Sequence, residues 1–218
     1  MIKSIFSQLG YQALSKGAMA LLLRVVMMLL GYLFIYSLNN RYGTSFIGDF
    51  TLIQSIFIII STICTLGLDT LSVKLVSPNS KNSKYLSILY NRILSYIIPL
   101  TIVISIILYY FSLNIALYFG SIDLSEPIKI LSFSLLPLAL ININGESFRG
   151  SKNMLFYSIY NKASLLSLLF ILLLFTTNSS MHSIDIYYYL FYVICLLALI
   201  STIHWKVIYI GSLNHINN

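Results

Sequence analysis

The feature that most constrains this chain is a series of six long apolar runs separated by short polar segments. About 20 apolar residues in a helix cross the hydrocarbon core of a bilayer. Only 9% of the 218 residues are charged, whereas soluble domains carry about 25%, so the chain has too few charges to cover a water-facing surface. We therefore predict an all-α integral membrane protein, a six-helix transmembrane bundle that forms one domain over 1–218. The predicted spans are 17–39, 46–71, 86–112, 127–149, 154–176 and 186–209.

The polar interruptions carry their own signals. In "RYGTSFIGDF" (41–50), Gly43 and Gly48 permit the chain to reverse between the first two spans. The segment "LNIALYFGSIDLS" is partly apolar and is expected to lie along the membrane surface. Pro99 and Pro137 fall inside the third and fourth spans and predict kinks, because proline cannot donate a helix hydrogen bond.

Basic residues are distributed unevenly between the two sides that six spans would create. Lysine and arginine in short loops favour the cytoplasmic side, so the richer side predicts cytoplasmic N- and C-termini. Arg24 lies within the first span, which is too long for a signal peptide and lacks a small-residue cleavage site. Two basic residues, Arg41 and Lys129, fall on the poorer side, and ten on the richer side: Lys3, Lys16, Lys74, Lys81, Lys84, Arg92, Arg149, Lys152, Lys162 and Lys206.

The sequence contains no pattern for a metal, a cofactor or a nucleic acid. Cys64 and Cys195 lie inside apolar runs without a second cysteine at ligand spacing, and the three histidines are scattered. The net charge of +7 follows from the cytoplasmic loops of the predicted topology rather than from a basic surface for nucleic acid.

Polar residues inside four of the spans recur at helical spacing, so each set shares one helix face. Charges within a membrane usually face a bundle interior or a wet cavity. Together the four faces predict a hydrated cleft with a positive lining, which suits an anionic substrate such as a diphosphate head group. The four sets are Gly17, Ala20, Arg24, Met28 and Gly31; Gly48, Thr51, Ser55, Thr62 and Asp69; Ser132, Ala139, Asn142, Glu146 and Arg149; and Tyr157, Asn161, Ser164 and either Ser167 or Leu168. The candidate substrate-pathway residues are Arg24, Ser55, Thr62, Asp69, Asn142, Glu146 and Arg149.

Each stripe also has a purely structural explanation, and both explanations stay open at this stage. Serine and threonine stripes hold membrane helices together. Asp69, Glu146 and Arg149 lie near helix ends, where long side chains reach water, and the last two are three residues apart and can pair. Arg24 lies about 12 Å along the helix from Lys16, and its structural alternative is an ion pair with Asp69.

Three short motifs resemble those of polysaccharide flippases of the MATE-like superfamily. A turn after the first helix matches at Arg41, Gly43, Phe46, Gly48 and Phe50, with Tyr42 where an aliphatic residue is usual. An element closing the second helix matches at Gly67, Leu68, Asp69 and Lys74. The link between the fourth and fifth helices matches at Arg149, Gly150 and Lys152. The matches fall in the order that the predicted topology requires.

The resemblance implies a non-enzymatic transporter of the bacterial inner membrane, of the O-antigen or capsular repeat-unit type. Its substrate would be a short glycan on undecaprenyl diphosphate, moved between leaflets by alternating access of two six-helix lobes around a cavity lined by cationic residues. Arg24 is the position to which that cationic role is carried over. The six predicted helices correspond to one lobe, so the chain is expected to be a truncated or half-size form, completed by a second six-helix half or by a homodimer.

Two other function classes remain as alternatives. A membrane-embedded glycan polymerase or glycosyltransferase would need a large outward loop with convergent catalytic residues, whereas the longest predicted outer loop carries only Asp123 and Glu126. No DxD motif, Ser/His/Asp set or glycine-rich phosphate loop is present. The permease subunit of an export pump would need a coupling helix in a cytoplasmic loop, and "SPNSKNSKYLS" is short for that purpose.

Overall fold

The computed structural model describes residues 2–160, 162–175 and 182–210, and the secondary structure in these ranges is helical, without strands. The prediction of an all-α chain is confirmed for this part of the sequence. The α-helices are α1 (Ile2–Thr65), α2 (Leu68–Asn79), α3 (Ser83–Tyr118), α4 (Ser125–Ser132), α5 (Leu135–Gly150), α6 (Met154–Ile159), α7 (Lys162–Phe175) and α8 (Asp185–Trp205). A 3-10 helix, η1 (Ile122–Leu124), precedes α4, and a π-helix, η2 (Lys206–Ile210), follows α8.

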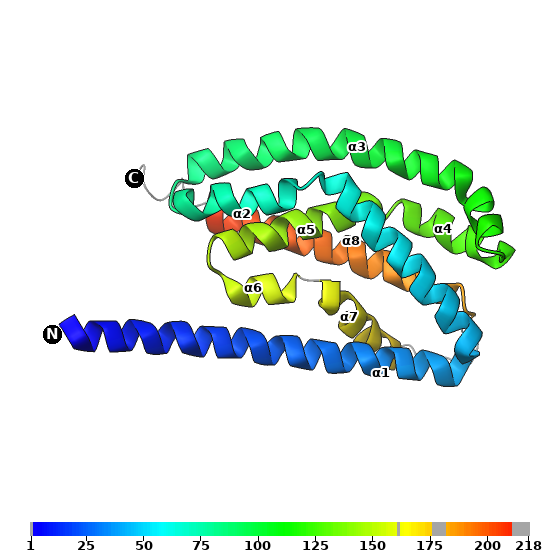
Figure 1. Ribbon diagram of the computed structural model, residues 1–218, viewed down its shortest axis with the longest axis horizontal. Helices are drawn as coiled ribbons and strands as arrows, with labels where there is room; N and C mark the ends of the chain where they lie inside the picture. Colours follow the sequence, from blue (N-terminus) through cyan, green and yellow to red (C-terminus); the bar gives the residue numbers. More distant parts are fainter. Residues whose placement is uncertain (1, 161, 176–181, 211–218) are drawn as a thin grey trace.

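Helix α1 is a hairpin of two legs rather than one straight rod. Its helical geometry is interrupted at Gly43, where φ is 82° and ψ is 175°. Such a backbone conformation strains any residue with a Cβ. At this break α1 reverses direction, so that the second leg (44–65) runs back along the bundle, as Figure 1 shows. The reversal predicted for the segment 41–50 is therefore confirmed at Gly43, whereas Gly48 lies inside the second leg and takes no part in it.

A left-handed turn separates α1 from α2. Leu66 and Gly67 have φ angles of 50° and 74°, and the chain resumes a helix at Leu68 that continues to Asn79. The prediction of one unbroken span over 46–71 is wrong here, because hydrophobicity does not register a two-residue backbone change. The polar turn expected after the second span is therefore limited to residues 80–82, between α2 and α3.

The middle helices also depart from the predicted boundaries. Helix α3 continues to Tyr118, so the first six residues of the segment expected on the membrane surface, 113–118, belong to α3. It passes through Pro99 without a break and curves gently (Figure 1). The fourth predicted span is bent by 57° between Ser132 and Leu135. This bend precedes Pro137, whose missing N–H leaves the carbonyl one turn earlier without its helical donor, and so confirms the second predicted kink.

Three helical segments of the described chain are long and apolar enough to cross a membrane: Gly17–Thr65, Ser83–Tyr118 and Asp185–Tyr209. The bent pair Ile122–Ser132 and Leu135–Gly150 raises the number to four if it counts as one span. These helices identify a membrane protein. The prediction of six spans, including one over 154–176 that the structure divides into α6 and α7, stays a prediction.

One end of the bundle gathers several helix ends. The beginning of α1, the α2–α3 turn, the α5–α6 turn and the end of α8 lie together at the left of Figure 1. Exposed lysines lie in these turns or at the adjoining helix ends, among them Lys81, Lys84, Lys152 and Lys206. We call this the cationic end. Basic residues from separate loops of the sequence therefore lie together at one end of the folded bundle.

Helix α5 lies in the centre of the bundle, where small residues bring its neighbours close. A Cβ added at Gly145 would lie 3.0 Å from the carbonyl oxygen of Tyr160, and one added at Gly150 would lie 3.0 Å from both Cα and O of Val73. The backbones of α2 and of the α6–α7 junction therefore pack directly on α5. Small residues permit this approach in membranes, where close packing replaces much of the hydrophobic driving force.

Candidate functional site

Polar and charged side chains from three helices meet near the cationic end of the bundle. Helix α5 contributes Glu146 and Arg149 in its last turns, α6 contributes Tyr157 and Ser158, and the first leg of α1 contributes Arg24. We call these five residues the arginine–tyrosine site. The α5–α6 turn is tight because Lys152 adopts a left-handed conformation with φ of 63°, and this brings α6 back beside the end of α5.

Glu146 and Arg149 form an ion pair, as their spacing predicted. The distance from Arg149 Nη2 to Glu146 Oε2 is 2.8 Å. The contact lacks hydrogen-bond geometry, since Oε2 is buried and accepts no hydrogen bond from the described residues. The Glu146 side chain is 18% exposed and that of Arg149 38%. Charge attraction therefore holds the pair, and the Arg149 guanidinium keeps part of its surface open.

Arg24 approaches the same site from the neighbouring helix. Its Cζ lies 4.8 Å from the centroid of the Tyr157 ring, and the Cζ of Arg149 lies 5.5 Å from that centroid. Both distances are within the range of cation–π attraction. Arg24 Nε also donates a hydrogen bond of 3.3 Å to Ser158 Oγ. Two guanidinium groups from different helices thus share one aromatic ring.

Arg24 does not form the ion pair with Asp69 that was considered as its structural explanation. Within the described residues, the pair between Glu146 and Arg149 is the sole ion pair within 4.0 Å. Arg24 is nevertheless exposed and keeps most of its hydrogen-bonding capacity free of carboxylate partners. Its charge acts on the Glu146 carboxylate, and its terminal N–H groups make no hydrogen bond to the described residues.

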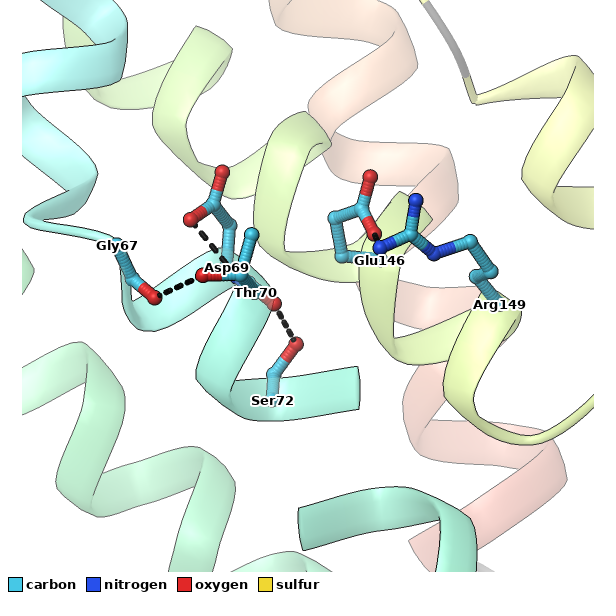
Figure 2. A network of polar contacts seen from close by, with 6 residues as sticks. All are labelled: Gly67, Asp69, Thr70, Ser72, Glu146 and Arg149. Atoms are coloured by element: carbon cyan, nitrogen blue, oxygen red, sulfur yellow. Dashed lines mark hydrogen bonds and ion pairs between the residues drawn. The ribbon is translucent and has the colours of Figure 1, made fainter. Parts of the chain in front are cut away.

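Asp69 lies beside the site but serves its own helix. It is in the first turn of α2, where a negative charge favours the helix dipole, and its Oδ1 accepts a hydrogen bond from the Thr70 backbone N–H at 2.8 Å. Figure 2 shows Asp69 on α2 and the Glu146–Arg149 pair on α5. The carboxylate of Asp69 is close enough to Glu146 to act on it electrostatically. Its helix-terminal position supports the structural explanation.

The predicted stripe of the second span is real, but it does not face the core of this bundle. Ser55 and Thr62 are both exposed, on the second leg of α1. Ser55 Oγ donates to the Thr51 carbonyl at 2.7 Å, and Thr62 Oγ1 donates to the Ile58 carbonyl at 2.8 Å. These hydroxyls are satisfied within their own helix. The structure does not bring them to the arginine–tyrosine site.

The prediction for the first span is partly wrong. Ala20 and Gly31 are buried, and Gly31 packs against Leu166 of α7, but Met28 is 74% exposed. The packed face is rotated from the predicted one, so that Arg24 lies at its edge rather than at its centre. In the fifth span, Ser164 and Ser167 are buried as a packing face would require, while Asn161 lies outside the described residues.

The fourth span contains a buried polar residue that periodicity did not select. Asn142 is half-buried, and its side chain makes no hydrogen bond to the described residues. Asn144 is instead fully buried: the Tyr90 hydroxyl donates to its Oδ1 at 2.9 Å, and its Nδ2 donates to Ser201 Oγ at 2.9 Å and to Thr202 Oγ1 at 3.1 Å. Sequence reasoning missed Asn144 because its partners come from α3 and α8.

The chemistry of the site is that of binding. The site presents two guanidinium groups beside the Tyr157 ring, and its carboxylate is engaged by Arg149. The Ser158 hydroxyl is buried and already bonded to Arg24 and to the Met154 carbonyl. The formal charges of Arg24, Arg149, Glu146 and Asp69 sum to zero, so these four residues do not give the net positive lining that was predicted. Arg24 has no carboxylate within 4.0 Å among the described residues, although its charge still acts on Glu146. Comparison with known families finds no matching family model, and neither the curated proteins nor the solved structures compared with this chain provide a match.

Proposed function

We propose that the chain is one six-pass lobe of a transporter that moves lipid-linked oligosaccharides across the bacterial inner membrane. In this proposal the substrate carries an undecaprenyl diphosphate head group, both termini are cytoplasmic, and a second lobe or a second copy of the chain completes the pathway. The motif resemblance gives the substrate class. The observation that carries the binding role is the pair of guanidiniums on Tyr157, one of them without a carboxylate partner among the described residues.

The proposal assigns six membrane crossings to the described helices, counted from the length of each helix and from where the chain reverses direction. The two legs of α1 would each cross, because 17–42 and 44–65 are each about as long as the bilayer core. Helix α3, the bent pair α4–α5, the broken pair α6–α7 and α8 would supply the other four. The resulting topology places the cationic end in the cytoplasm, in agreement with the preference of basic residues for that side.

A diphosphate fits the arginine–tyrosine site better than a neutral sugar does. Guanidinium groups bind phosphate oxygens through paired, charge-assisted hydrogen bonds. Arg24 can offer its terminal N–H groups to such an oxygen while its Nε remains bonded to Ser158. Arg149 can add a second contact through the exposed part of its guanidinium, whose charge Glu146 otherwise balances.

The first test is binding, because a single lobe need not support transport by itself. We expect Arg24→Ala to weaken binding of undecaprenyl diphosphate about tenfold, which corresponds to the loss of one hydrogen bond to a charged group. Arg24→Lys should retain part of the affinity, since it keeps the charge but not the planar group. Binding is measured on the detergent-solubilised chain by displacement of a fluorescent polyprenyl diphosphate.

The matched control is Arg92→Ala, which removes an exposed cation from α3 at the same end of the bundle. Its affinity should equal that of the unsubstituted chain. An equal loss in both alanine variants would mean that binding follows net charge alone, and it would remove Arg24 from the proposed site. Tight binding of uncharged polyprenol by the unsubstituted chain would contradict recognition of the diphosphate.

A second test concerns the exposed stripe of α1. In the proposal the stripe borders a hydrated pathway shared with the second lobe, so Ser55→Cys and Thr62→Cys should react with a water-soluble, membrane-impermeant thiol reagent. Cys64 and Cys195 are first replaced by alanine; the former is buried and the latter half-buried. Ile107→Cys, on an exposed apolar face of α3, is the control and should stay unlabelled. Protection of both stripe cysteines to the level of the control would place the stripe in lipid.

A further inference from the structure

A groove of about 340 Å³ lies on the outer face of α3, beside the bend between α4 and α5. One wall is α3, with Ile102, Ile106, Tyr109 and Tyr110, and the other is the bend, with Phe133. The volume is at the low end of the range of ligand pockets, about 300–1,000 Å³. The groove is separate from the arginine–tyrosine site, to which it contributes no residue.

The bend creates the groove and leaves it apolar. Phe133, at the break, is 60% exposed, and its ring centroid lies 5.6 Å from that of Tyr109. At the floor of the groove, Ser105 Oγ donates a hydrogen bond to the Ser132 carbonyl. This carbonyl, at the end of α4, therefore needs no water. The polar groups at the floor of the groove are hydrogen-bonded to each other, and its walls are aliphatic and aromatic. Such a groove suits a hydrocarbon chain.

The depth of the groove can be judged from α3 itself. Arg92 is exposed, nine residues after the start of α3, and its long side chain allows the charged group to reach the membrane–water boundary. Ile102 lies ten residues further along the helix, about 15 Å at 1.5 Å per residue, which is about half of the 30 Å hydrocarbon core. The groove therefore extends from the mid-plane to the far boundary, where Tyr109 and Tyr110 occupy the usual level of interfacial tyrosines.

We infer that this groove holds one acyl chain of a phospholipid from the leaflet opposite the cationic end. The head group lies near Tyr110, and the chain passes Ile106 and Ile102 towards the mid-plane. The lipid-linked substrate is a poorer occupant, because α3 and the first leg of α1, which carries Arg24, lie on opposite sides of the molecule (Figure 1). The inference depends on α3 spanning the bilayer and not on the proposed transport function.

Brominated lipids provide the test, because bromine quenches tryptophan fluorescence only at short range. Ile106→Trp places the reporter in the groove and Ile107→Trp places it one residue away, outside the groove at nearly the same depth. The two native side chains are equally open, at 51% and 50% exposure. Each variant is reconstituted in phosphatidylcholine vesicles with an increasing fraction of phosphatidylcholine brominated at mid-chain. The unsubstituted chain gives the background from Trp205.

At low fractions of brominated lipid, we expect the groove tryptophan to be quenched several times more than the Ile107→Trp control. Tyr110→Trp, a milder exchange at the rim, should behave like Ile106→Trp and serves if the latter fails to fold. Phe133→Ala should remove the excess quenching by opening the groove wall. Superimposed curves for groove and control positions would overturn the inference. Relief of the excess by a small fraction of undecaprenyl phosphate would also overturn it, since it would assign the groove to the polyprenyl carrier.

Discussion

Replacement of Gly150 by alanine is expected to destabilise the bundle by about 1–3 kcal/mol, the usual effect of overpacking a filled interior. The added Cβ would lie 3.0 Å from Cα and from the carbonyl oxygen of Val73, and 3.1 Å from Cβ of Val76. Two of these neighbours are backbone atoms of α2, so relief requires movement of the whole helix. Thermal unfolding in detergent, followed by size-exclusion chromatography, measures the loss of folded protein.

The control for this experiment is Gly48→Ala. Gly48 lies inside the second leg of α1, with nothing within 4 Å of an added Cβ and with an ordinary helical φ. Alanine there should stabilise the helix by up to about 1 kcal/mol, because glycine has the lower helix propensity. Equal melting temperatures for Gly150→Ala and the unsubstituted chain would show that α2 and α5 are not packed as closely as the structure has them.

The second large effect is expected at Asn144. Asn144→Ala removes three hydrogen bonds that connect α5 to α3 and α8, and leaves the buried hydroxyl of Tyr90 without its acceptor. A buried polar group without a partner costs about 1–3 kcal/mol, and individual hydrogen bonds between membrane helices contribute about 0.6 kcal/mol on average. We expect a loss of about 2 kcal/mol in the free energy of unfolding, measured by titration with a denaturing detergent.

A double-mutant cycle separates the network from simple loss of volume. Asn144→Ala and Ser201→Ala should be less than additive when combined, because each removes the same hydrogen bond. Asn142→Ala is the matched control, two residues away on α5, and should change stability little because its amide makes no hydrogen bond to the described residues. Strict additivity of the first two, or a comparable loss in the control, would contradict the assignment of Asn144 as the polar centre of the bundle.

Two members of the motif at 149–152, Gly150 and Lys152, have a structural explanation. Gly150 is required by contact with α2, and Lys152 forms a left-handed turn. Arg149, by contrast, is held beside Tyr157 and Glu146 with part of its guanidinium open. The functional proposal therefore concerns the arginine, whereas the adjacent glycine is explained by packing.

The sequence by itself determined that this is a membrane protein, and it determined features set by residues close together in the chain. Hydrophobic runs identify membrane helices because a bilayer demands length and apolarity from each span, and these quantities are local. The reversal at Gly43 and the pair of Glu146 and Arg149 are also local, since they need only a backbone without a Cβ and a spacing of three residues. Such features are fixed within one or two helical turns.

Only the tertiary structure decided which polar residues meet. Arg24 and Tyr157 are far apart in the chain, and their contact depends on how the α5–α6 turn returns beside α1. Periodicity assigned Asn142 to the interior, but the partners of Asn144 lie on α3 and α8 and cannot be read from α5. The spacing of polar residues shows which side of a helix they share, but not which other helix packs against that side. The arginine–tyrosine site and the hydrogen bonds of Asn144 therefore depend on contacts between segments distant in the sequence.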